Sequence, residues 1–107
     1  MSFLDASKVD EGLDSGLLPQ GKMYHIACKS WTTSNGVTLP LSMKFIGDDG
    51  DHLIYVPEIK VNYTEEKCYS GILSREFDCE AVFGGLLRKF KLILYCEVCK
   101  WVMLVPD

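Results

Sequence analysis

The chain has 107 residues, of which 48% are hydrophobic and 24% are charged, and its net charge is −4. This composition is typical of one globular domain and argues against both a disordered chain and a membrane protein. A negative net charge also disfavours nucleic acid as a partner, because binding to phosphates requires a basic surface.

The N-terminal segment, residues 1–21, differs from the rest because glycines and acidic residues recur along it. Ser2 can cap a helical turn over Phe3–Val9 before the glycines end it. Five large apolar residues make the segment too hydrophobic for a free tail: Phe3, Leu4, Leu13, Leu17 and Leu18. We therefore expect an N-terminal strap that lies over one end of the domain or contacts a second subunit. The remainder, 22–107, is expected to be a single antiparallel β domain.

Six segments after the strap have the alternating apolar pattern and the flanking turn residues of strands: 22–32, 37–46, 52–63, 75–83, 86–96 and 100–106. Three dipeptides between them favour tight hairpin turns: Asn35-Gly36, Asp49-Gly50 and Gly84-Gly85. The sequence predicts no long helix.

The first of these turns sets the register of the first hairpin. A two-residue turn places Cys28 opposite Met43 on an apolar face, and Trp31 opposite Pro40 on the other face. Because Pro40 has no N–H to donate, we expect it to mark a strand edge or a bulge.

The second turn places Phe45 opposite Ile54 and so extends the same apolar face. At Pro57-Glu58 the alternation shifts by one residue, which predicts a bulge and a bend. Residues 64–67 are polar and are predicted to form a loop.

The third turn places opposite charges across the hairpin, with Glu80 facing Lys89 and Asp78 facing Lys91. Such pairs contribute about 0.2–1 kcal/mol each, and a slip of one residue would also turn the apolar side chains outward. Pairing within the sheet therefore explains these basic residues better than a ligand site does.

The last segment is apolar at almost every position, so we expect both of its faces to be covered. Antiparallel strands that share one apolar face bury it by curling or by folding over. The sequence therefore predicts an all-β fold, a small six-stranded antiparallel barrel or two-layer roll made of successive hairpins. The barrel is favoured.

The cysteines carry the one spacing typical of a metal site. Cys96 and Cys99 form a C-x-x-C motif beside a turn, which is half of a four-ligand zinc site. His25 and Cys28 fall on opposite faces of a strand, so they do not offer the second pair. A small zinc-binding protein that uses Cys96 and Cys99 is therefore the alternative hypothesis, and no motif indicates any other cofactor.

The total of five cysteines is odd, which favours free thiols over a disulfide framework. The N-terminus also has neither the basic region nor the apolar run of a secretory signal. Both features predict a cytoplasmic protein, because thiols stay reduced in that compartment.

No catalytic residue is predicted. His25 and His52 are the two histidines, and the hairpin pattern places them far apart. No nucleophile motif, paired carboxylate or phosphate loop accompanies them. We therefore expect no enzymatic activity.

The leading hypothesis is a non-enzymatic binding domain whose partner is another protein or a second copy in a homodimer. Four apolar residues at outward positions exceed what the surface of a monomeric barrel would carry: Trp31, Ile93, Val102 and Leu104. Pairing of edge strands or exchange of the strap would cover them. We expect neither nucleic acid nor a membrane as a partner.

Overall fold

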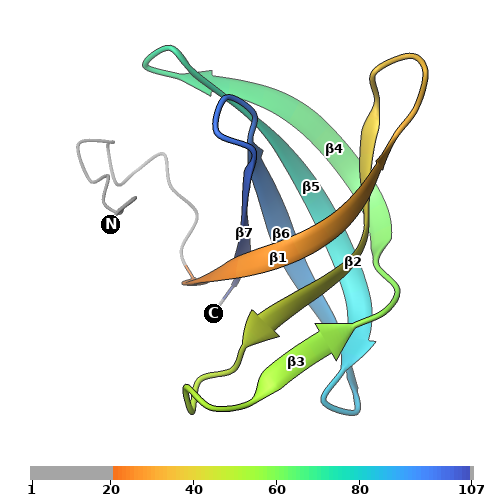
Figure 1. The fold of residues 1–107 in the computed structure, drawn as a ribbon, viewed down its shortest axis with the longest axis vertical. Helices are drawn as coiled ribbons and strands as arrows, with labels where there is room; N and C mark the ends of the chain where they lie inside the picture. Colours follow the sequence, from red (N-terminus) through yellow and green to blue (C-terminus); the bar gives the residue numbers. More distant parts are fainter. Residues whose placement is uncertain (1–20, 107) are drawn as a thin grey trace.

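The computed structural model describes residues 21–106, which form one curled sheet of strands joined by short connections (Figure 1). The seven strands are β1 (Lys22–Thr32), β2 (Thr38–Ile46), β3 (Leu53–Val56), β4 (Lys60–Tyr69), β5 (Ile72–Phe83), β6 (Leu86–Tyr95) and β7 (Lys100–Val105). No helix occurs among these described residues, so none of them belongs to a helix that could cross a membrane. The predicted all-β fold is confirmed.

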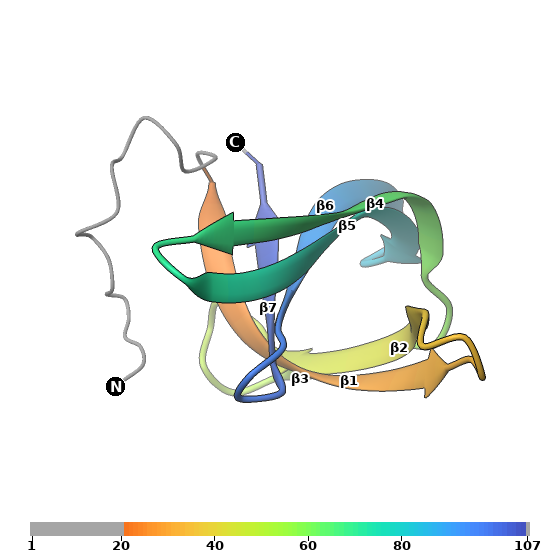
Figure 2. The ribbon, with the colours of Figure 1, turned by 90° about the horizontal axis from the view of Figure 1, so that it is seen from above.

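The strand order in the sheet is β3-β2-β1-β7-β6-β5-β4, and every neighbouring pair is antiparallel. Pairing between β1 and β7 joins the three N-terminal strands to the four C-terminal strands. Figures 1 and 2 show the sheet curling around one concave face into a half-barrel. The predicted strap lies outside the described residues except for Gly21, which lies so close to the carbonyl oxygen of Val105 that an added Cβ atom would clash with it.

The predicted single strand at 52–63 is wrong, because the structure divides it into β3 and β4. The predicted bend at Pro57-Glu58 is the point of division. The N–H of Ile59 donates a hydrogen bond of 3.1 Å to the carbonyl oxygen of Leu41 in β2. The connection is therefore bonded to β2, and β3 and β4 are left as the two edges of the sheet instead of closing a barrel.

The predicted loop at 64–67 is also wrong, because these residues belong to the edge strand β4. A fourth hairpin turn follows at Ser70-Gly71, where both residues have positive φ, 52° and 81°. Those angles are typical of a tight hairpin turn. The charges that suggested a loop are instead the polar side chains of an edge strand.

The turn of the first hairpin is longer than predicted. The N–H of Thr33 donates to the carbonyl oxygen of Val37 at 2.9 Å, so three residues lie between them. Trp31 consequently lies opposite Leu39, and the predicted pair of Trp31 with Pro40 is wrong.

A bulge in β2 compensates for the longer turn. The register shifts between Lys29 and Ser30, where Leu41 is the extra residue of β2. The extra residue in the turn and the extra residue in β2 shift the register in opposite directions. Cys28 therefore still lies opposite Met43, as predicted. The predicted irregularity at Pro40 is thereby confirmed as a bulge beside it.

The remaining predicted pairs are confirmed, including Phe45 with Ile54, Glu80 with Lys89 and Asp78 with Lys91. The core on the concave face consists of buried side chains from both halves of the sheet: Met43, Phe45, Val56, Phe77, Cys79, Ala81, Phe90, Leu92 and Met103. Aromatic rings tie the strands together across this face, with Phe77 and Trp101 at a centroid distance of 5.6 Å.

Candidate functional site

Three large apolar side chains lie on the convex face at the β3 end of the sheet, and we call Ile46, Leu53 and Tyr55 the edge strip. Leu53 is 61% exposed and Tyr55 is 55% exposed. Ile46 lies opposite Leu53, and Lys44 lies opposite Tyr55 with its Nζ atom 5.7 Å from the ring centroid. The edge strip is therefore a continuous apolar surface over two strands, flanked by one cation.

The backbone of β3 offers unpaired groups along the same edge. The N–H of Gly47 donates to the carbonyl oxygen of His52 at 2.9 Å, so these two residues form a hydrogen-bonded pair. Such pairs alternate along an antiparallel ladder, which makes Ile54 the next residue of β3 that bonds to β2. The N–H and C=O groups of Leu53 and Tyr55 therefore point away from β2, where no strand among residues 21–106 pairs with them.

The turn that precedes β3 is fastened to β1. The carboxylate of Asp48 accepts hydrogen bonds from Lys22 Nζ at 2.6 Å and from the Tyr24 hydroxyl at 2.8 Å. The bond from Lys22 is the main reason that the Asp48 pKa is lowered. Asp49 accepts from the N–H groups of Asp51 and His52 and also contacts the His52 ring, so these residues shape the turn.

The two edges of the sheet differ in their protection. β4 has a register shift near its start, between Val61 and Tyr63. It also carries charged residues along its length: Lys60, Glu65, Glu66 and Lys67. Charges and bulges discourage an edge strand from pairing with another chain. β3 consists of Leu53–Val56 and has no charge, no proline and no bulge. It is the unprotected edge.

Of the four predicted interface residues, Trp31 is 63% exposed, whereas Ile93, Val102 and Leu104 are buried. Ile93 and Val102 oppose each other in β6 and β7. The structure therefore leaves only Trp31 open to a partner. Sequence reasoning missed the edge strip, although its members occupy outward positions on both sides of the Asp49-Gly50 turn.

The predicted metal ligands Cys96 and Cys99 lie in the turn between β6 and β7. Cys99 has a φ of 54°, and its Sγ atom lies 3.7 Å from the carbonyl oxygen of Cys96. Within residues 21–106, no third histidine, cysteine or acidic side chain joins them in a cluster that could hold a metal ion. One chain thus presents two thiols on a turn, which is half of a tetrahedral site.

A buried carboxylate lies among the predicted charge pairs. Glu76 accepts a hydrogen bond of 3.0 Å from Lys91 and lies 3.5 Å from Lys67. Burial lowers the pKa of Lys91, but the hydrogen bond and the charge of Glu76 outweigh burial, so its pKa is raised. These contacts join β4, β5 and β6 and therefore serve the sheet itself.

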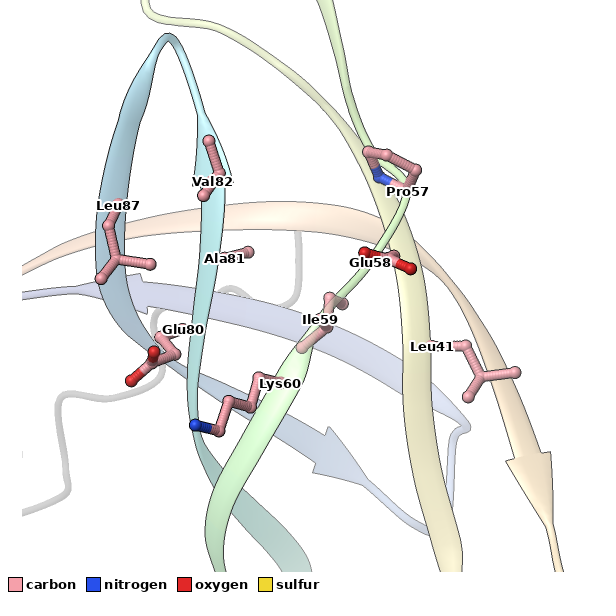
Figure 3. Close-up of a pocket in the computed structure, with 9 residues that line it drawn as sticks. All are labelled: Leu41, Pro57, Glu58, Ile59, Lys60, Glu80, Ala81, Val82 and Leu87. Carbon is pink, nitrogen blue, oxygen red and sulfur yellow. The ribbon is translucent and has the colours of Figure 1, made fainter.

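An open groove of about 740 Å³ lies beside the segment that connects β3 to β4, and residues of β2, β5 and β6 line it as well (Figure 3). Val82 and Leu87 lie on one side of the connecting segment and Leu41 lies on the other. Among residues 21–106, the charged residues of its lining are Glu58, Lys60 and Glu80, and Glu80 also accepts a hydrogen bond from Asn62 at 3.0 Å.

Comparison of the chain with models of protein families, with curated protein sequences and with solved structures found no match.

Proposed function

We propose that this protein is a small, non-enzymatic, cytoplasmic interaction domain that associates with a second copy of itself through its β3 edge. The observation that carries the proposal is the coincidence, on one short strand, of an exposed apolar strip and unpaired backbone groups. Large exposed apolar patches mark interaction sites, and unprotected edge strands pair with other chains. The five free cysteines support a reducing compartment.

Burial of the edge strip supplies the driving force for association. Covering a leucine side chain fully contributes about 1.5–3 kcal/mol, and an isologous contact counts each residue twice. Leu53 and Ile46 form one exposed cross-strand pair, so a partner that covers one side chain covers the other.

Leu53→Lys is expected to weaken self-association at least about tenfold, because it places a charge in each half of the apolar contact. Val98→Lys is the matched control, since Val98 and Leu53 are both 61% exposed and Val98 lies in the β6–β7 turn. Sedimentation equilibrium up to millimolar chain concentration measures the effect. A wild-type chain that stays monomeric throughout contradicts the proposal, as does an equal loss in both variants.

Zinc binding by Cys96 and Cys99 is a second candidate function, favoured by the presence of two thiols on one turn outside the core. Because a structural zinc ion takes four ligands, two copies would supply two cysteines each. Thiolates bind the ion, so binding would release the thiol protons.

Cys96→Ser is expected to abolish zinc binding, whereas Cys68→Ser, which removes another exposed thiol, is expected to leave it unchanged. Elemental analysis after zinc loading and gel filtration gives the stoichiometry, with one ion per two chains as the expected value. A metal-free wild-type protein, or equal binding by both variants, rules this candidate out.

A further inference from the structure

We infer that the β3 edge pairs with β3 of a second copy, antiparallel, across a two-fold axis that passes beside Ile54. The inference rests on the proposed self-association and names the contact that produces it. The register with Ile54 at the axis satisfies both the backbone groups and the side chains of this strand.

The backbone groups of β3 that have no partner within the described sheet determine which residues oppose each other. Leu53 and Tyr55 are the residues of β3 whose N–H and C=O groups point away from β2. With Ile54 at the axis, Leu53 of each copy lies opposite Tyr55 of the other. Two residues opposed in this way exchange two hydrogen bonds. The two symmetric pairs therefore use every outward-pointing backbone group of the two residues, in both copies.

The side chains agree with the same register. Opposed residues in an antiparallel pair project to the same face of the sheet. Leu53 therefore packs against Tyr55 of the second copy on the convex face, and the two edge strips merge. Ile54, which packs on the core, lies beside Ile54 of the second copy on the concave face. A shift by one residue would bring an inward side chain opposite an outward one and would mismatch the hydrogen bonds.

Charge favours this edge over the other. Leu53–Val56 contains no ionisable carboxylate or cation, so two copies of β3 meet without like-charge repulsion. The same symmetric pairing at the middle of β4 would bring Glu65 and Glu66 of both copies together, and opposed like charges destabilise a pair. The interface over four residues of β3 is small, so we expect a weak and reversible dimer.

Tyr55→Pro tests the backbone contact, with Tyr55→Val as its matched control. The Tyr55 N–H faces away from β2, so proline there removes no hydrogen bond within the chain, and edge strands accept proline at such positions. Both variants remove the ring, but only proline removes the donor in each copy. We expect Tyr55→Pro to dimerise at least about tenfold more weakly than Tyr55→Val in sedimentation equilibrium. Thermal unfolding checks that both variants fold.

Ile54→Cys tests the position of the axis independently. Residues opposed at a non-hydrogen-bonded pair have Cα atoms about 4.5 Å apart, which suits a disulfide. In a background with Cys68→Ser and Cys99→Ser, oxidised glutathione is expected to link two copies through residue 54, and the two thiols reduce it to glutathione. Tyr55→Cys in the same background is the control, because residue 55 faces residue 53 and not itself.

Each combination of results is decisive. A selective loss in Tyr55→Pro together with selective linkage at residue 54 supports the pairing. If the wild type associates but Tyr55→Pro and Tyr55→Val dimerise equally well, the pairing is overturned and the proposed function stands. The same holds if a disulfide forms no faster at residue 54 than at residue 55. A wild-type chain that never associates overturns both.

Discussion

Phe77→Ala is expected to lower the free energy of unfolding by about 3–5 kcal/mol. The Phe77 side chain is fully buried on the concave face, opposite Leu92 in β6 and against the ring of Trp101 in β7. Truncation to alanine removes these apolar contacts and leaves a cavity between β5, β6 and β7, because paired strands relax only partly around a lost side chain. Since domains of this size are stable by only about 5–15 kcal/mol, this one change would cost a large part of the total.

Urea unfolding followed by tryptophan fluorescence measures the loss, because Trp101 contacts the ring that is removed. Tyr63→Ala is the control, since Tyr63 is an exposed aromatic residue of β4 and its truncation is expected to change stability little. Equal stability of Phe77→Ala and the wild type would show that the curled sheet does not enclose its core as described.

Cys79 is expected to react with iodoacetamide at pH 8 at least about a thousandfold more slowly than an ordinary cysteine. Burial, followed by the charge of Asp78, raises the pKa of Cys79 from 9.0 to about 12. Burial likewise raises the pKa of Cys28 to about 12. The reactive thiolate is therefore rarer by three powers of ten at these two positions, and steric closure slows the reaction further.

Mass spectrometry of peptides after timed labelling checks this result. Cys68 is exposed and serves as the internal control, and all five cysteines are expected to react alike in urea. Fast labelling of Cys79 in the folded chain would contradict the burial described above.

The raised pKa values of Cys28 and Cys79 also make stability depend on pH. The protonated thiols of the folded state contribute stability that is fully present below pH 9.0 and is lost as the pH rises towards about 12.

The parts of the fold that could be predicted are those determined over short stretches of sequence. Asp49-Gly50 and Gly84-Gly85 lie between residues that must pair with each other, so a turn type and an alternating pattern suffice to set the register. The first hairpin shows the limit of this method. The turn has one residue more than predicted, which shifts the register so that Trp31 pairs with Leu39 instead of Pro40. The extra residue of the β2 bulge shifts the register back, so Cys28 pairs with Met43 as predicted.

The remaining errors involve contacts between distant segments. β3 and β4 are two strands because β3 pairs with β2 whereas β4 pairs with β5, and the Ile59 bond to Leu41 lies between them. The local sequence pattern indicates the bend but not these distant partners. The candidate site depends on this break, because β3 is an edge only where it fails to pair with β4. The alternating pattern also fails to predict the burial of Val102. It places Val102 at an outward position, but that position is covered in the folded sheet.

The pairing of β1 with β7 also affects how the chain reaches this fold. Lys22 lies opposite Val105, and 105 − 22 gives 83 positions of separation. Closing so long a loop costs conformational entropy before the contact returns any stability, which slows folding. The first hairpin is synthesised early but has no neighbour on its β1 side until β7 has left the ribosome. Completion of the sheet therefore waits for β7, and until then the apolar face of β1–β3 is exposed to chaperones and to other nascent chains.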